Sequence, residues 1–363
     1  MTSTPGDTGP APAGAVPGDT GGPATGDHVP GDDLVAREPF GRGRSAHLAG
    51  ASFAGVPARR IADLTAGVVA LVGAPFDWGT SHRPGARFGP KAIREGDYLP
   101  ADGERPHLTA GIDPLRALPV VDTGDVDVVP GYVELSLERI ERHVRAVAEA
   151  GAVPVLLGGD HTVTYAGAKA VAEVAGAGAV ALVHFDAHAD TGTDHHGQLH
   201  GHGTPMRRLI ESGAVPGHRF VQIGLRGYWP PPDVVAWMRR QRMRSFFMAD
   251  ITRRGLDAVV DDAVAAALGD GARGVYVSVD IDVVDPGMAP GTGTPEPGGI
   301  SARELLDTVQ RLGRDLHVLG ADIVEVAPHY DQPADITARL ANRVVLELLT
   351  GMALRRRDLG QAG

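Results

Sequence analysis

The sequence contains no cysteine in 363 residues, and this absence excludes several kinds of chemistry. Disulfides, thiolate nucleophiles, iron–sulfur clusters and cysteine-ligated zinc sites all require thiol side chains. Any metal ion must therefore be held by oxygen and nitrogen ligands. The chain also lacks an apolar run near the ~18 residues that a membrane-spanning helix needs. Its N-terminus has neither the basic start nor the apolar stretch of a secretory signal peptide, so we expect a cytoplasmic protein.

Positive charge is scarce, with 34 Lys and Arg against 45 Asp and Glu and a formal net charge of -11. Nucleic-acid binding depends mainly on clustered Lys and Arg, so neither a nucleic-acid nor a membrane partner is expected. An acidic protein is better suited to a cationic small molecule. The 43% hydrophobic and 22% charged residues are typical of a globular protein with a sizeable core.

Residues 1–33 lack aromatic residues, Lys and Arg, and they contain 8 Gly and 6 Pro. Such a segment cannot bury enough apolar surface to offset the loss of chain entropy on folding. We therefore predict a disordered Gly/Pro-rich tail over 1–33. No Pro/Ser-rich linker interrupts residues 50–355, so 34–363 are expected to form a single domain.

Beyond the tail, short apolar runs alternate with segments of helical length. This pattern predicts an α/β fold, in which a parallel sheet is covered by helices on both faces. The predicted strands are 68–72, 153–157, 179–185, 220–223, 275–279 and 318–323. The predicted amphipathic helices are 133–150, 163–174, 256–268 and 302–312.

Polar motifs follow three of the predicted strands. Gly-Gly-Asp-His occupies 158–161, Asp-Ala-His-Ala-Asp occupies 186–190, and Asp-Ile-Asp occupies 280–282. Alternate side chains of an extended chain face the same way, so the acidic and imidazole groups of each motif are predicted to converge. Ligand sites in open α/β sheets form at the carboxyl ends of strands, where all three motifs lie.

Carboxylates crowded into one place repel one another and lose hydration unless positive charge lies among them. Two divalent cations would neutralise the four negative charges of the second and third motifs. A carboxylate-rich set with few imidazoles suits Mn(II), although Ni(II), Co(II) or Fe(II) also bind such ligands. Two ions about 3.5–4 Å apart activate water for attack on carbon or phosphorus. The motifs together therefore predict binuclear hydrolysis.

These motifs resemble the three signatures of the ureohydrolases, the arginase and agmatinase family. The likeness covers roughly residues 65–350 and is closer to agmatinases and guanidinobutyrases than to arginase itself. It continues through Pro-Phe-Asp at 75–77, Arg-Pro-Gly-Ala-Arg-Phe-Gly-Pro at 83–90, Gln-Ile-Gly-Leu-Arg at 222–226, the glycine- and proline-rich segment 289–299, and Asp-Ile-Val-Glu-Val-Ala-Pro at 322–328. The resemblance implies a three-layer α/β/α fold, a mainly parallel eight-stranded sheet, and a homo-oligomer, commonly a trimer or hexamer.

The resemblance also implies a binuclear manganese centre with a defined ligand set. One ion would be held by His161, Asp186, Asp190 and Asp280, and the other by Asp186, His188, Asp280 and Asp282. Asp186 and Asp280 would bridge both ions.

Three catalytic roles follow. Guanidinium is planar and permanently cationic, so a carboxylate must pair with it beside the metals, and Glu325 resembles that anchor. The leaving amine needs a proton, and His202 resembles the loop histidine that handles it. Asp190 would accept and relay the proton of the nucleophile.

Other residues near these motifs allow more than one interpretation. His195, His196 and His200 are interpreted as solvated loop residues, and His184 as a buried, hydrogen-bonded histidine. The rings of Tyr228 and Trp229 either line the pocket or pack elsewhere.

The substrate is expected to be a linear alkylguanidine, with agmatine, yielding urea and putrescine, as the leading candidate. A cationic far end needs an acidic rim, for which Asp194 is a candidate contact. The carboxylate of 4-guanidinobutyrate needs donors such as His195, His196 or Arg83. Guanidinopropionate and free guanidine also remain open as substrates.

Two alternatives come from other classes of protein. One is a deacetylase with a single zinc ion, which would lack the full six-ligand set. The other is a non-catalytic subunit, which is expected to have lost His202 or Glu325.

Overall fold

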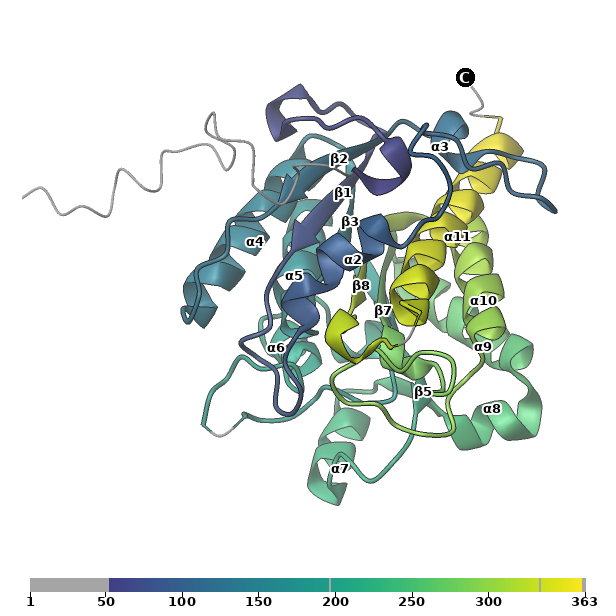
Figure 1. Ribbon diagram of the computed structural model, residues 1–363. Helices are drawn as coiled ribbons and strands as arrows, with labels where there is room; N and C mark the ends of the chain where they lie inside the picture. Colours follow the sequence, from purple (N-terminus) through teal and green to yellow (C-terminus); the bar gives the residue numbers. More distant parts are fainter. Residues whose placement is uncertain (1–51, 196, 333, 361–363) are drawn as a thin grey trace, which may run out of the picture. The chain divides into compact units, whose positions relative to one another are not determined.

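The computed structural model describes residues 52–195, 197–332 and 334–360, and within them eight strands form one sheet (Figure 1). The strand order is β2-β1-β3-β8-β7-β4-β5-β6, and every neighbouring pair is parallel. The α/β prediction is confirmed, with a sheet that is parallel throughout rather than mainly parallel. The strands are β1 (Val69–Ala74), β2 (Val120–Asp125), β3 (Val153–Gly158), β4 (Val180–Phe185), β5 (Phe220–Leu225), β6 (Arg244–Phe247), β7 (Gly274–Asp280) and β8 (Val318–Val324).

Helices cover both faces of the sheet because its strands carry apolar side chains on both sides. In β1, Val69 and Leu71 belong to one apolar cluster, whereas Ala70 and Val72 belong to another on the opposite face. The second cluster is closed by α4 (Val133–Glu149), α5 (Thr162–Ala175) and α6 (Pro205–Glu211) (Figure 1). The first is closed by α2 (Gly89–Glu95), α8 (Met248–Arg254), α9 (Leu256–Leu268), α10 (Ala302–Asp315) and α11 (Ile336–Asp358).

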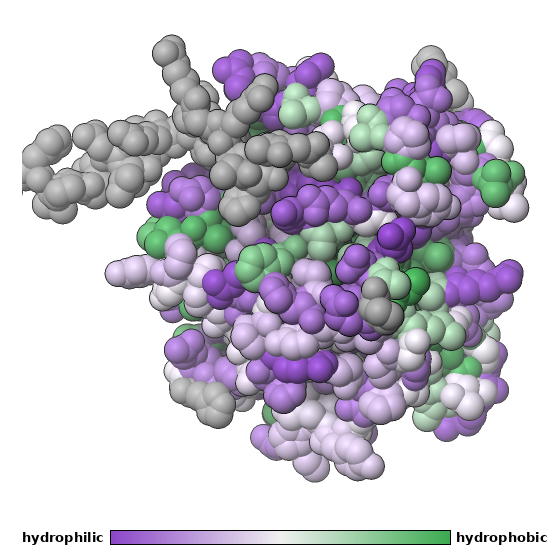
Figure 2. All heavy atoms as spheres, in the orientation of Figure 1, coloured by the Kyte–Doolittle hydropathy of each residue, from purple (hydrophilic) through white to green (hydrophobic). Residues whose placement is uncertain are grey.

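The remaining α-helices of the described part are α3 (Pro114–Ala117) and α7 (Pro232–Arg240), and several 3₁₀ turns join the elements. On the face seen in Figure 2, hydrophobic residues lie scattered among hydrophilic ones. None of the described helices has both the length and the apolar character that crossing a membrane requires.

All six predicted strands and all four predicted helices are present, with ends shifted by a few residues at most. The apolar pattern did not predict β2 and β6, nor the long helix α11. The predicted tail over 1–33 lies outside the described residues, so the division at residue 33 stays a prediction.

The strand order places the polar motifs at the centre of the sheet. Strands β3, β8, β7 and β4 are consecutive neighbours, although they are far apart along the chain. The motif at 158–161 follows β3, the motif at 186–190 follows β4, and the motif at 280–282 begins at the end of β7. Because the strands are parallel, all three motifs emerge at the same edge.

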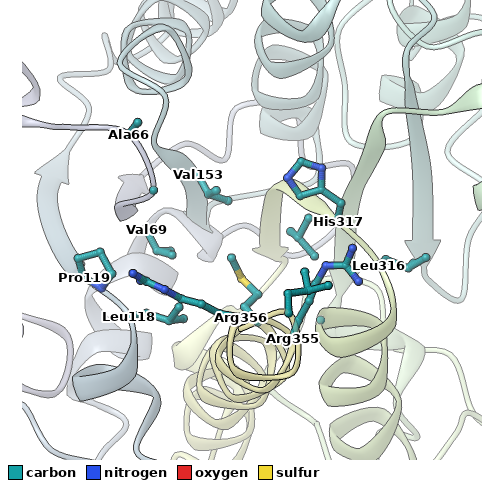
Figure 3. Close-up of a pocket in the computed structure, with 14 residues that line it drawn as sticks. Ala66, Val69, Leu118, Pro119, Val153, Leu316, His317, Arg355 and Arg356 are labelled. Atoms are coloured by element: carbon teal, nitrogen blue, oxygen red, sulfur yellow. The ribbon is translucent and has the colours of Figure 1, made fainter. Parts of the chain in front are cut away.

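The opposite edge of the sheet carries a hollow of about 510 Å³ (Figure 3). It lies between the first residues of β1, β3 and β8 and the ends of α10 and α11. None of the described residues that line it is Asp or Glu. Arg355, near the end of α11, donates to the carbonyl oxygens of Arg314 and Asp315 at 3.3 and 3.2 Å. Its charge thus compensates the C-terminal end of α10, and the described lining offers the His317 imidazole but no carboxylate to a metal ion.

A buried ion-pair group joins α2 to β2. The Arg94 guanidinium donates to both carboxylate oxygens of Asp122, at 2.8 and 2.9 Å, and also to Asp125. All three side chains are at most 5% exposed. The two carboxylates raise the pKa of Arg94 well above its usual value against the opposing effect of burial. The arginine therefore stays charged and offsets part of the negative charge of a carboxylate pair that has little access to water.

We predict that Arg94→Met lowers the free energy of unfolding by about 3–5 kcal/mol, because it leaves two buried carboxylates without a cation. Urea denaturation at pH 7.5 measures this change. Lys91→Met on the same helix is the matched control, because the Lys91–Glu95 pair is exposed and should contribute less than about 1 kcal/mol. Equal losses of unfolding free energy in the two variants would contradict a stabilising role of the buried Arg94 ion pairs.

A second buried group lies between α4 and β2. His143 is 2% exposed, and its Nε2 lies 3.2 Å from Thr123 Oγ1. Burial lowers the pKa of His143 to about 4. The folded protein therefore holds this imidazole neutral under conditions in which an exposed histidine becomes charged.

In the unfolded chain the His143 imidazole takes up a proton near pH 6.5, whereas in the folded chain it does so only near pH 4. As the pH falls between these values, protonation favours the unfolded chain and the free energy of unfolding decreases. We predict that, from pH 7 to pH 4, the wild type loses about 3 kcal/mol more unfolding free energy than His143→Gln does. Urea titrations across this range provide the measurement. His218→Gln, at a partly exposed site, should keep the wild-type pH dependence, and the same dependence in His143→Gln would refute the prediction.

Candidate metal centre and active site

The turn after β3 seats the first histidine of the site. A Cβ added to Gly159 would lie 1.8 Å from the carbonyl oxygen of Phe76, so only glycine fits there. The Asp160 N–H donates to the same oxygen at 2.8 Å. This close contact between the turns after β1 and β3 places His161 directly before α5, with its side chain fully buried.

Three carboxylates surround one nitrogen of His161. Its Nδ1 lies 2.9 Å from Asp190 Oδ2 and 3.1 Å from both Asp186 Oδ2 and Asp280 Oδ2. These four residues are the predicted ligand set of one ion. The structure thus brings together side chains that follow β3, β4 and β7.

The remaining predicted ligands form a second group beside the first. His188 Nδ1 lies 3.0 Å from Asp282 Oδ2 and 3.4 Å from Asp186 Oδ1. The Asp282 N–H donates to Asp280 Oδ1 at 2.9 Å, which fixes the two carboxylates of the third motif relative to each other. Asp186 contacts both histidines, as expected of a residue that bridges two ions.

The pKa values of the site show how strongly it requires positive charge. Burial, together with the charges of Asp282 and Asp186, raises the pKa of Asp280 well above its usual range. Burial lowers the pKa of His188, but Asp282 and Asp186 outweigh it and raise the value to about 12. Without metal, the site could reach neutrality only by retaining protons on groups that usually release them at pH 7.

One buried nitrogen atom indicates how a metal would fit. Within the described part of the chain, His161 Nδ1 has no hydrogen-bond partner of ordinary geometry, although three carboxylate oxygens lie within 3.1 Å of it. Ligand atoms that converge on one point without hydrogen-bonding one another are typical of a metal site. Four carboxylates and two imidazoles match the ligand preference of Mn(II) and related divalent ions. The residues therefore fit a pair of divalent cations.

Buried neighbours orient these candidate ligands. His161 Nε2 lies 2.9 Å from Ser278 Oγ. His184 Nε2 contacts Asp186 Oδ2 at 2.8 Å, and its Nδ1 lies 3.0 Å from Gln222 Nε2. The expectation that His184 is a buried, hydrogen-bonded residue is confirmed. Contacts of this kind hold metal ligands in place and tune their basicity.

Glu325 and His202 lie together at the wall of the site. Glu325 Oε1 accepts the backbone N–H of His161 at 2.9 Å and lies 3.0 Å from His202 Nδ1. Glu325 Oε2 is buried and has no hydrogen-bond partner among the described residues. Burial lowers the pKa of His202, but the charge of Glu325, with Asp160 and Asp190, raises it to about 9.

Two of the predicted site residues have left-handed backbone conformations. The φ angles are 52° at Asp190 and 63° at Glu325, in a region that residues other than glycine rarely adopt. Such conformations cost of the order of 1–3 kcal/mol and concentrate at functional sites. Both positions follow a central strand, where the chain must turn sharply to direct a carboxylate toward the site.

Sequence reasoning missed the role of the loop after β1. Asp160 Oδ2 accepts the Gly79 N–H at 2.8 Å and the Thr80 hydroxyl at 3.3 Å. Ser81, farther along this loop, contacts His202. Asp160 belongs to the first polar motif, but no sequence pattern predicts that it binds the loop after β1 or that Ser81 contacts His202.

A cavity of about 240 Å³ opens onto these groups. Its described lining residues are Ser81, His188, Asp190, Asp194, His195, His202, Gly203, Thr204, Trp229, Asp280, Thr294 and Glu325. None of them is Lys or Arg. Arg83 is not among them, because its guanidinium donates to the carbonyl oxygens of Thr292 and Gly293 and lies over the Tyr330 ring.

The loop residues have distinct surroundings. His195 and Trp229 line the cavity, whereas the Tyr228 side chain is fully exposed. His200 differs from the expected solvated residue, since it is half-buried and its ring lies 5.1 Å from that of Tyr165. His196 lies outside the described residues.

A parallel sheet with a buried carboxylate–imidazole centre at its carboxyl edge defines a metal-dependent hydrolase of the α/β class. The arginase family model matches residues 68–351 of this chain. The chain is 40% identical over 282 residues to proclavaminate amidinohydrolase from Streptomyces clavuligerus. The aligned region covers 77% of this chain and 87% of that protein. The solved structure of that enzyme has a TM-score of 0.76, with 37% identity, over 84% of this chain and 97% of the other.

Two further relatives have similar identities. The mitochondrial agmatinase of Gallus gallus is 40% identical over 77% of this chain and 79% of its own length. Guanidinopropionase of Pseudomonas aeruginosa is 39% identical over 83% of this chain and 93% of its own length. The chain therefore belongs to the arginase family, as its motifs indicated, and it is an amidinohydrolase of that family.

We predict that Asp280→Ala removes bound metal and hydrolytic activity together, because Asp280 would bridge the two ions. Metal analysis of the purified protein should fall from two divalent ions per chain to at most one, and turnover should fall at least about a hundredfold, or ~2.7 kcal/mol.

Asp285→Ala is the matched control, because Asp285 lies just after the same motif but its carboxylate accepts the backbone N–H groups of Gly287 and Gly298. This control should keep both ions. Full metal content or full turnover in Asp280→Ala would rule out the proposed centre.

Proposed function

We propose that the protein hydrolyses a linear guanidino compound to urea and an amine. The observation that carries this proposal is the Glu325 carboxylate at the cavity wall. Its Oε1 is engaged by His161 and His202, while its Oε2 is buried without a partner among the described residues. A buried acceptor beside a metal centre suits the N–H groups of a planar cation, and guanidinium has these in abundance.

The metals would be held by the six residues predicted from the sequence. One ion would take His161, Asp186, Asp190 and Asp280, and the other Asp186, His188, Asp280 and Asp282. When bound, the two ions would supply an activated water as the nucleophile at neutral pH. Mn(II) is our first choice, with Ni(II) or Co(II) as alternatives.

The protein's own groups then have separate tasks. Glu325 Oε2 accepts a guanidinium N–H and holds the central carbon toward the metals. Asp190, which lines the cavity and lies 2.9 Å from His161, takes the proton of the nucleophile at its carboxylate. His202 lines the same cavity and delivers a proton to the departing amine, which otherwise leaves poorly.

Agmatine is the substrate that the cavity favours. The described lining contains exposed Asp194 but neither Lys nor Arg, so it offers an acceptor for a distant ammonium group. Of the donors considered for a carboxylate, Arg83 donates to two carbonyl oxygens, His195 lines the cavity, and His196 lies outside the described residues. 4-Guanidinobutyrate, guanidinopropionate and free guanidine are therefore second to agmatine, whose products would be urea and the polyamine putrescine.

The alternatives from other classes have less support. A deacetylase with one zinc ion does not need the second group formed by His188 and Asp282. A non-catalytic subunit does not require Glu325 and His202 to contact each other at the cavity wall. A homo-oligomer of three or six chains and a cytoplasmic location stay predictions.

We predict that the manganese-loaded protein releases urea from agmatine with a kcat/KM at least about tenfold, or ~1.4 kcal/mol, above that for 4-guanidinobutyrate, 3-guanidinopropionate, arginine or guanidine. A coupled urea assay on this panel, repeated with nickel, provides the measurement. Preference for a carboxylate-bearing substrate would overturn the choice of agmatine. Absence of urea from all five would overturn the proposed reaction.

Substitution of Asp194 by Asn (Asp194→Asn) also tests whether agmatine is the substrate. It should raise the KM for agmatine without a comparable change for guanidine, which has no distant ammonium group. Asp233→Asn, on α7 and away from the cavity lining, is the control and should leave both KM values unchanged.

A further inference from the structure

Ser81 makes two contacts with one atom of His202. Its backbone N–H donates to His202 Nε2 at 3.1 Å, and its Oγ lies 2.6 Å from the same nitrogen. A backbone N–H can only donate, so Nε2 is the acceptor and carries no hydrogen. The proton of the neutral ring must then lie on Nδ1, from which it is donated to Glu325 Oε1 at 3.0 Å.

Two backbone hydrogen bonds of Gly79 hold the loop that carries Ser81 in place. Gly79 N–H donates to the buried carboxylate of Asp160, which follows β3. In return, the carbonyl oxygen of Gly79 accepts the backbone N–H of His202 at 3.0 Å. The loop is thus fixed to the turn before His161 and to the backbone of His202, so that the Ser81 contact is one part of a built arrangement.

This arrangement also determines which oxygen of Glu325 is free. Oε1 receives the His161 N–H and the His202 Nδ1–H, whereas Oε2 receives no bond from the described residues. If the neutral His202 ring exchanged its tautomer, Nδ1 would become an acceptor facing a carboxylate oxygen. That contact is repulsive, so the tautomer and the position of Glu325 depend on each other.

We propose that Ser81 is a positioning residue, whose N–H and hydroxyl hold His202 in the Nδ1–H tautomer and leave Nε2 as the atom that takes up a proton. The inference rests on the proposed function, because the proton on His202 matters for catalysis only if an amine is expelled. Ser81 itself is exposed and lines the cavity, and therefore its replacement should not disturb the core.

Kinetics of two substitutions test the role in turnover. Ser81→Ala keeps the N–H but loses the hydroxyl, so kcat for agmatine should fall about tenfold. KM should change less than about threefold, because Glu325 keeps its bond from His161. Ser81→Thr restores the hydroxyl and should recover at least half of the wild-type kcat, with two ions per chain in both variants. Ser212→Ala, which removes a hydroxyl from the end of α6, is the control.

Wild-type kcat in Ser81→Ala, or equal losses in Ser81→Ala and Ser81→Thr, would overturn the proposal. Neutron diffraction supplies a second readout that needs no turnover. In crystals of the manganese-loaded protein exchanged into D₂O at about pH 10, above the raised pKa of His202, the ring is neutral, and deuterium should appear on His202 Nδ1 and on Ser81 N, directed at an unprotonated Nε2. Deuterium on Nε2 would refute the tautomer assignment even if no substrate of the panel is cleaved.

Discussion

The mutual repulsion of four buried carboxylates is the constraint on which the rest of this structure depends. Asp186, Asp190, Asp280 and Asp282 are almost fully removed from water, and two imidazoles lie among them. Such a group is stable only if positive charge compensates it, either as retained protons or as metal ions. Two divalent cations satisfy this condition with ordinary ligand chemistry. A pair of metal ions would therefore serve both the proposed activity and the local electrostatics.

The sheet makes this crowding possible. Its strand order brings β3, β8, β7 and β4 together, so that residues separated by more than a hundred positions meet at one edge. The rigid core below allows unfavourable backbone conformations at Asp190 and Glu325 to persist. Helices on both faces bury the strands almost completely, and the polar groups are concentrated where the strands end.

Much of the fold and the ligand set could be predicted from the sequence, since both arise from local patterns. Period-two motifs directly after apolar runs predict that His161, Asp186 and Asp280 lie near one another, and they do. The strands β2 and β6 escaped prediction because β2 carries buried Asp122 and Asp125, neutralised by a distant arginine, and β6 is a short, partly exposed edge strand. The contacts of Ser81 and Asp160 join separate loops, and sequence spacing contains no signal for them.

The reaction class follows more directly from the residues than the substrate does. In the proposed reaction, the metal ligands and Glu325 would act on the guanidinium group, which all candidate substrates share. In the proposed complex, the far end of the substrate would meet rim residues such as Asp194 and His195, which line the cavity. A family with one chemistry can therefore serve several guanidino compounds by changing a small part of its surface.

The central claim is that two divalent ions lie between these carboxylates, and low-temperature electron paramagnetic resonance of the manganese-loaded protein tests it most directly. Carboxylates that bridge two Mn(II) ions couple their spins, so the account predicts the spectrum of an exchange-coupled pair at two equivalents of manganese. The spectrum of isolated Mn(II) at saturation, with one ion per chain, would contradict it.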